Sequence, residues 1–147
     1  MTDTKKELSA SEFINMMLDN AIMERASDVH IEPRMKDMRI RFRIDGILHE
    51  KWIEPLYDLE AIVNRIKVLT NLDITTRDTP QEGHFLKEMP ATPPLSQPQI
   101  INVRVSVFPT VHGESIVLRL LDQRNIILDF EKLGMDTDVL DTYKSLI

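Results

Sequence analysis

The sequence predicts an α+β domain built on a mostly antiparallel sheet. Between residues 38 and 44, apolar and arginine side chains alternate at every position, which is the period of a half-buried strand. One face would carry Met38, Ile40, Phe42 and Ile44, and the other Arg39, Arg41 and Arg43. Between residues 59 and 69, apolar residues instead return after three or four positions, as in a helix. The Asp45-Gly46 pair is typical of a tight hairpin turn, which joins antiparallel strands.

A first helix is expected to begin after Ser9, behind a polar lead-in at residues 1–8. Ser9 and Glu12 have the spacing of a capping box, in which each side chain bonds the backbone of the other residue. The following apolar residues repeat at helical spacing and predict one buried face and an end near Arg25. They are Ile14, Met17, Leu18, Ala21 and Ile22.

Three strands should follow as a meander. Residues 28–32 alternate polar with apolar side chains, and Pro33 ends this strand because proline has no N–H to donate. The second strand spans about 38–44, and the third runs from 47 to 53 after the hairpin turn.

The middle of the chain predicts a helix, a loop and a strand. Residues 56–72 have helical spacing, with the apolar positions Leu59, Ile62, Val63, Ile66 and Leu69. Residues 73–80 are polar without a period and predict a loop, and residues 83–89 predict a strand. The four prolines within residues 90–98 predict an exposed loop, because they block regular structure.

Two further strands are predicted at residues 99–108 and 116–121, with a turn at 109–113. The last strand is apolar on both faces apart from Arg119, so we expect it at the centre of the sheet. Residues 123–130 indicate an extended connector, and a helix capped by Asp136 is expected over residues 136–147. This ending suggests a piece of a longer protein.

Composition restricts the class of protein. The chain has 147 residues, of which 42% are hydrophobic, enough for one domain with one core. It has no cysteine, which excludes disulfides and thiolate sites. The net charge of -6 argues against nucleic acid as a partner, because such binding depends on a broad basic field. No apolar run reaches the roughly 18 residues of a membrane-spanning helix.

The usual motifs for chemistry are missing. No glycine stands in a phosphate-binding loop, so the chain is not expected to hydrolyse a nucleotide by itself, and no catalytic residue is predicted. The histidines lie in separate segments without metal-ligand spacing, so no metal site is predicted. What remains is arginine on strands, namely Arg39, Arg41, Arg43, Arg104 and Arg119, together with Arg77 and His84 at the loop between the second helix and the fourth strand. Guanidinium groups held on rigid strands are suited to binding phosphate, although they are also common as solvated surface pairs.

Six ordered motifs across about a hundred residues resemble the secretion ATPases of type II secretion and type IV pilus assembly. They are Ala26-Ser-Asp-Val-His-Ile-Glu-Pro33, Arg41-Phe-Arg-Ile-Asp-Gly46, Arg65-Ile-Lys-Val-Leu with Leu72-Asp-Ile74, Pro80-Gln-Glu-Gly83, Val103-Arg-Val-Ser106, and Gly113-Glu114 with Val117-Leu-Arg-Leu-Leu-Asp122. The resemblance implies that residues 9–122 form a PAS-like domain with helices packed on one face of its sheet. Residues 123–147 would be the connector and the start of a RecA-like ATPase domain, ending before its Walker A loop.

The resemblance also implies a function. In these hexameric motors, the N-terminal domain supplies arginines to the phosphates of ATP bound, with Mg²⁺, by the RecA-like domain. Arg104 matches one such position, and Arg77 is a second candidate. His84 stands where the family usually has an arginine, and a protonated histidine can also contact phosphate. ATP hydrolysis is expected in the full-length protein, with no nucleotide held tightly by this chain.

The implied partners are the RecA-like domain of the same or a neighbouring subunit and platform or adaptor proteins of the inner membrane. The implied location is the cytoplasm, with attachment to that membrane through partners. A second reading remains open, in which Arg39, Arg41 and Arg43 form a stripe that docks an acidic protein partner without any phosphate contact.

Overall fold

The computed structural model describes residues 8–55, 59–91, 98–121 and 136–146. Within these ranges the chain forms three helices and six strands, which confirms the α+β class. In order they are α1 (Ala10–Met23), β1 (Asp28–Pro33), β2 (Asp37–Ile44), β3 (Ile47–Pro55), α2 (Leu59–Leu69), β4 (Gln81–Met89), β5 (Gln99–Thr110), β6 (Gly113–Leu121) and α3 (Thr137–Leu146).

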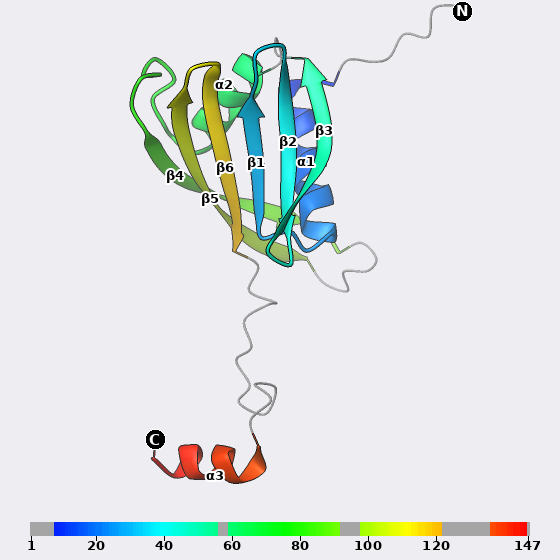
Figure 1. Cartoon of the computed structure of the whole chain (residues 1–147), viewed down its shortest axis with the longest axis vertical. Coiled ribbons are helices and arrows are strands. Elements are labelled where there is room, and N and C mark those ends of the chain that lie inside the picture. Colours follow the sequence, from blue (N-terminus) through cyan, green and yellow to red (C-terminus); the bar gives the residue numbers. More distant parts are fainter. Residues whose placement is uncertain (1–7, 56–58, 92–97, 122–135, 147) are drawn as a thin grey trace, which may run out of the picture.

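All six strands lie in one antiparallel sheet. Their order is β3-β2-β1-β6-β5-β4, and each neighbouring pair is antiparallel. Two meanders of three strands therefore meet along β1 and β6 (Figure 1). The central position predicted for residues 116–121 is confirmed, since β6 lies between β1 and β5.

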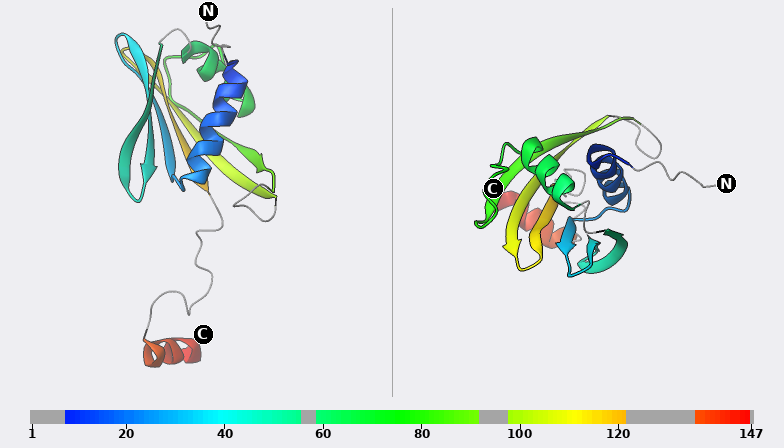
Figure 2. Two further views of the ribbon diagram at one scale, coloured as in Figure 1. Left: turned by 90° about the vertical axis from the view of Figure 1, so that its right-hand side faces the viewer. Right: turned by 90° about the horizontal axis from the view of Figure 1, so that it is seen from above.

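The core lies between the sheet and two helices. α1 and α2 cover one face of the sheet and leave the other face uncovered (Figure 2). The alternation predicted for β2 is confirmed, because Met38, Ile40 and Phe42 are fully buried. β5 and β6 bury Val103, Val105, Val107, Ile116 and Leu118 on the same side. The even-numbered residues of β5 and the odd-numbered residues of β6 consequently face away from the helices.

Local signals determine where α1 and the first hairpin begin and end. The Glu12 backbone N–H donates to Ser9 Oγ over 3.3 Å, and the Ser9 N–H donates to Glu12 Oε2 over 2.9 Å, which confirms the capping box. Arg25, with φ of 57°, follows the end of α1. Asp45 and Gly46 have φ of 49° and 81°, as a two-residue hairpin turn with two positive φ angles requires.

An aromatic cluster joins α1 to the first meander. The Trp52 ring forms T-shaped pairs with Phe42 and Phe13, with ring centroids 5.4 Å and 6.4 Å apart. Edge-to-face pairs at such distances are favourable beyond the area that they bury. α1 is thereby held over β2 and β3.

Several predicted boundaries were wrong by two or three residues: β3 ends at Pro55 rather than at residue 53, β6 begins at Gly113 rather than at residue 116, and α2 ends at Leu69 rather than at residue 72. β4 begins at Gln81 rather than at residue 83, because Gln81 pairs with Val107 and extends the ladder. β5 continues through Pro109 to Thr110, which shortens the predicted turn to residues 111–112. The turn is closed by Thr110 Oγ1, which donates to the Gly113 carbonyl over 2.6 Å.

Several predicted segments lie outside the described residues: most of the lead-in, residues 92–97 of the proline-rich loop, and the connector at 123–130. The last predicted helix is present as α3, and the Leu140 N–H donates to the Asp136 carbonyl over 2.9 Å at its start. Among the described helices, none is long and apolar enough to cross a membrane.

Candidate phosphate-contact surface

A row of basic side chains crosses the uncovered face of the sheet. The strand register places His84 of β4 opposite Arg104 of β5, and Arg104 opposite Arg119 of β6. Directly opposite residues on neighbouring antiparallel strands share one face, with Cβ atoms about 4.5–5.5 Å apart. We call His84, Arg104 and Arg119 the basic row. Segments 15 or more residues apart in the sequence thus contribute to one small surface.

Arg104 is open to a ligand. It is exposed on β5 and makes no hydrogen bond or ion pair with any described residue. Together with His84, Glu82, Gly83 and Asn102 it lines a shallow depression of ≈ 510 Å³ on this face. A guanidinium in an internal ion pair would be poorly available to phosphate, and the described part of the chain provides no such pair for Arg104.

The stripe on β2 is different, because each of its arginines is paired with a carboxylate of β1. Glu32 accepts from Arg39 Nη2 over 2.8 Å and is also paired with Arg41. Arg43 lies 3.5 Å from Asp28 and donates to the Gly46 carbonyl over 2.9 Å. Burial raises the pKa of Glu32, but hydrogen bonds from Arg41 and Arg39 outweigh it and hold that pKa below its ordinary value. The three guanidinium groups therefore already have hydrogen-bond or ion-pair partners within the fold, which leaves them less available to a ligand than Arg104.

Asp28 joins the stripe to the basic row. Its carboxylate is 8% exposed and accepts from Arg119 Nε over 2.9 Å and from Ser27 Oγ over 2.8 Å. Burial raises the pKa of Asp28, but the hydrogen bonds from Arg119 and Ser27 outweigh this effect and hold that pKa below its ordinary value. The folded chain consequently keeps Asp28 ionised.

These lowered pKa values predict a loss of stability in acid. A carboxylate whose pKa is lower in the folded chain stabilises the fold above its unfolded pKa of about 4, and this contribution disappears as the pH falls through the folded pKa. We expect the free energy of unfolding, measured with urea from pH 7 to pH 2, to fall below pH 4. The Asp28→Asn variant should start less stable at pH 7 and lose less on acidification.

The matched control is Glu88→Gln, which changes an exposed carboxylate of β4. It should keep the pH dependence of the unchanged chain. If Asp28→Asn and the unchanged chain lose stability in parallel between pH 5 and pH 2, Asp28 is not a source of the acid sensitivity.

Arg77 lies elsewhere. It lines a second depression of ≈ 270 Å³ with residues of α2 and of the β5–β6 hairpin, among them Leu59, Glu60, His112 and Glu114. Its guanidinium donates to Glu60 on α2, and both side chains are more than half exposed. The hydrogen bond and charge of Glu60 raise the pKa of Arg77, so it remains cationic. The structure thus brings His84 and Arg104 together and places Arg77 in a separate depression.

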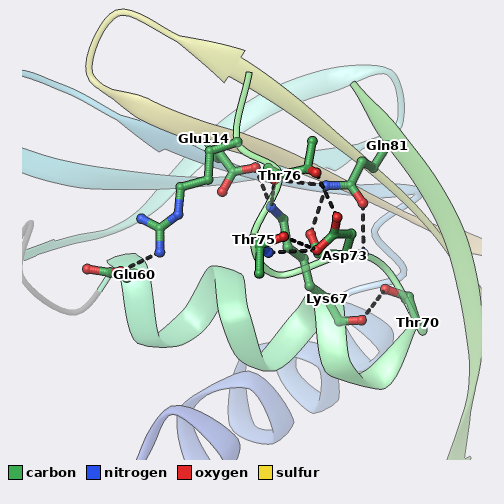
Figure 3. A network of polar contacts seen from close by, with 9 residues as sticks. Glu60, Lys67, Thr70, Asp73, Thr75, Thr76, Gln81 and Glu114 are labelled. Carbon is green, nitrogen blue, oxygen red and sulfur yellow. Dashed lines mark hydrogen bonds and ion pairs between the residues drawn. The ribbon is translucent and has the colours of Figure 1, made fainter. Parts of the chain in front are cut away.

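The loop that carries Arg77 has an ordered polar framework (Figure 3). Asp73 accepts from the Thr75 N–H and hydroxyl and from the Thr76 hydroxyl, over 2.7 to 2.8 Å. Hydrogen bonds from Thr75 and Thr76 lower the pKa of Asp73 far below its ordinary value. Gln81 bonds the Asp73 backbone N–H and carbonyl and the Thr76 carbonyl. The loop at residues 73–80, which shows no period in the sequence, is therefore held by hydrogen bonds to Gln81, the first residue of β4.

Beneath this loop lies a buried ion pair that was not predicted from the sequence. Lys67 of α2 is fully buried, and its ammonium lies 2.7 Å from the carboxylate of Glu114 on β6, which is 7% exposed (Figure 3). Lys67 also donates to the Thr76 carbonyl over 2.7 Å. The pair connects α2, the loop and β6. One signal was present in the sequence: Lys67 follows Val63 by four positions and so falls on the apolar face of the helix.

No group of three or more potential metal ligands occurs among the described residues. His30, between Asp28 and Glu32 on β1, is half-buried, and burial lowers its pKa. Its neighbours on the same face are Val117 of β6 and the paired carboxylates and arginines already described.

Comparison with known proteins gives consistent matches. A family model described as "Type II/IV secretion system protein" matches residues 3–147. The type IV pilus assembly ATPase PilB of Myxococcus xanthus is 42% identical over 134 residues, which cover 91% of this chain and 23% of that protein. The type II secretion system protein E of Xanthomonas campestris is 35% identical over 147 residues, covering 100% of this chain and 25% of that protein. The chain thus spans about a quarter of the length of these relatives.

Among solved structures, the ATPase DotB of Yersinia pseudotuberculosis has a TM-score of 0.56 at 17% identity, covering 92% of this chain and 37% of that one. At this identity the likeness concerns the fold alone.

Proposed function

Because the chain belongs to the type II/IV secretion system protein family, we propose that it is a regulatory N-terminal domain of a secretion or pilus-assembly motor. In this role it supplies Arg104, Arg77 and His84 to the phosphates of ATP bound by a RecA-like domain. The relatives named as ATPases support the class of motor, and the chain itself contains no phosphate-binding glycine loop. Its contribution is therefore a cationic contact to nucleotide held elsewhere.

The observation that carries the proposal is the basic row on the uncovered sheet face. Arg104 has basic neighbours on both sides and no carboxylate partner among the described residues. Like charges directly opposite one another destabilise a sheet, so an anion between them is the arrangement that offsets their repulsion. A triphosphate offers several negative oxygens in the geometry that a planar guanidinium recognises.

The strand positions suit such a contact. Val103 and Val105 anchor β5 in the core on either side of Arg104, so the guanidinium is presented from a rigid element. A positioned cation of this kind stabilises charge that develops on the transferred phosphoryl group. Arg77 would reach phosphate from its own depression by giving up its ion pair with Glu60. This pair is exposed to solvent and therefore weak.

The remaining features belong to the same proposal. ATP with Mg²⁺ would be bound by the RecA-like domain, and the assembled motor would be a hexamer in the cytoplasm, attached to the inner membrane through platform or adaptor proteins. We also propose a PAS-like classification and the domain division 9–122 and 123–147. The antiparallel sheet with helices on one face supports the classification.

The test is Arg104→Ala in the full-length motor. We expect ATP turnover to fall about tenfold or more with the fold intact, as when an arginine finger is removed. Turnover is measured under saturating ATP, and folding by the thermal unfolding of the same variant.

Arg65→Ala is the matched control, because Arg65 is an exposed arginine on α2 outside the basic row. It should retain turnover within twofold. Unchanged turnover in Arg104→Ala would remove Arg104 from the nucleotide contact, and an equal loss in both variants would show that the effect is not local.

The alternative of an acidic docking partner is less well supported. Such a partner would compete with Glu32 and Asp28 for the guanidinium groups of Arg39, Arg41 and Arg43. The fold already holds both carboxylates at hydrogen-bond or ion-pair distance from these arginines, so an acidic partner would have to displace them. The stripe is therefore better explained as a set of cross-strand pairs that stabilises the pairing of β1 with β2.

A further inference from the structure

We infer that Arg119 is a second phosphate-binding arginine of the same surface, held ready by the buried carboxylate of Asp28. This inference rests on the proposed function and adds a residue to its contact. Arg119 lies directly opposite Arg104 in the strand register and shares its face of the sheet. The side chain of Arg119 is 65% exposed although its partner carboxylate is almost fully buried.

The geometry at Arg119 divides its guanidinium into two parts. Nε donates to Asp28 Oδ1 over 2.9 Å, which fixes the root of the planar group. Within the described residues, the two terminal nitrogens make no hydrogen bond or ion pair. A guanidinium has five N–H donors, so four remain on the terminal nitrogens for a ligand. The hydrogen bond from Nε to Asp28 thus orients the guanidinium group and leaves both terminal nitrogens available to bind phosphate oxygens.

The distribution of carboxylates indicates which end of this face accepts an anion. On β1 and β2, Arg39 lies opposite Glu32 and Arg43 lies opposite Asp28. On β4, β5 and β6, the residues at the same level are His84, Arg104 and Arg119, with no carboxylate among them. Asp28 is shared by Arg43 and Arg119 and is the only acidic side chain at that level of β1. Glu82, two positions before His84 on the same face of β4, also lines the depression, so the basic row has one nearby carboxylate on β4 besides Asp28 on β1, which pairs with Arg119.

Two arginines at this spacing can bind one phosphate chain together. Cβ atoms about 4.5–5.5 Å apart allow two long side chains to converge on neighbouring oxygens. An anion that lies between the two guanidinium groups attracts both of them and offsets the repulsion between them. The expected ligand class is the polyphosphate of a nucleotide, which is the anion of the proposed function.

The first experiment measures turnover of the full-length motor. Arg119→Ala is expected to lower it about tenfold or more, and Arg119→Lys by less because it keeps a charge but loses the planar fork. The double variant Arg104→Ala/Arg119→Ala should lose less than the product of the two single losses, since both residues act on one ligand. Arg65→Ala serves again as control.

The outcomes separate this inference from the proposed function. If Arg104→Ala is impaired and both Arg119 variants stay within twofold of the unchanged motor, the inference fails and the proposed function stands. If neither Arg104→Ala nor Arg119→Ala is impaired, both fail. Thermal unfolding of each variant identifies a loss caused by misfolding, in which case Arg119→Lys decides.

The second experiment does not depend on catalysis. The Nε–H signals of arginine are followed by NMR in the 147-residue chain while sodium tripolyphosphate is added at constant ionic strength. Signals of Arg104 and Arg119 should shift together, while that of Arg65 stays in place. A titration in which Arg119 does not move overturns the inference.

Discussion

Replacement of Lys67 by methionine should lower the free energy of unfolding by about 3–5 kcal/mol, the usual cost of removing one partner from a buried ion pair. The expected loss comes from the groups that Lys67 would leave without a partner. Glu114 is 7% exposed and would lose the ammonium 2.7 Å away, leaving a buried carboxylate without its counter-ion. The Thr76 carbonyl would lose its donor at the same time. Urea unfolding of the chain at pH 7 measures the change.

A double variant and a surface control make this prediction specific. Lys67→Met with Glu114→Met should recover most of the loss, because replacing a whole buried pair by apolar side chains is often neutral or stabilising. Lys36→Met changes an exposed lysine in the loop between β1 and β2 and should stay within about 0.5 kcal/mol. A loss below about 1 kcal/mol for Lys67→Met would mean that water or a rearranged side chain reaches Glu114.

Substitution of Gly83 by alanine should destabilise the fold by about 1–3 kcal/mol, as expected for overpacking against rigid neighbours. A Cβ atom at Gly83 would lie 2.9 Å from Thr70 Cβ and 3.0 Å from the Thr70 carbonyl oxygen. Both atoms are fixed by the backbone at the end of α2, and Thr70 Oγ1 donates to the Ile66 carbonyl over 2.8 Å. Rotation of a side chain cannot relieve the contact, so β4 or α2 must move.

The matched control is Glu82→Ala, one residue earlier on β4, where the side chain is exposed on the other face. It should change stability by less than about 0.5 kcal/mol in the same urea experiment. Equal stability of Gly83→Ala and Glu82→Ala would show that α2 yields to the added methyl group. The close approach also gives the Gln-Glu-Gly motif a structural role, since it lets β4 pack against the end of α2.

Much of the fold was predictable because its signals are local. The alternation at residues 38–44 identifies both the buried and the arginine face of β2, since side-chain direction in a strand has a period of two. The capping box at Ser9 and the Asp45-Gly46 turn act within a few residues and are present as predicted. The central position of β6 followed from its two apolar faces.

Periodicity and local motifs were therefore enough to predict the elements, their inward faces and the arginines as candidate residues. Which charges are neighbours depends on how the strands are ordered in the folded chain. Periodicity shows that Arg104 and Arg119 face away from the core, but strand order and register place them opposite each other and place Asp28 beside Arg119. The same holds for Lys67, whose burial depends on a carboxylate 47 positions later in the chain. Ion pairing depends on distances of a few ångströms, which a one-dimensional pattern does not contain.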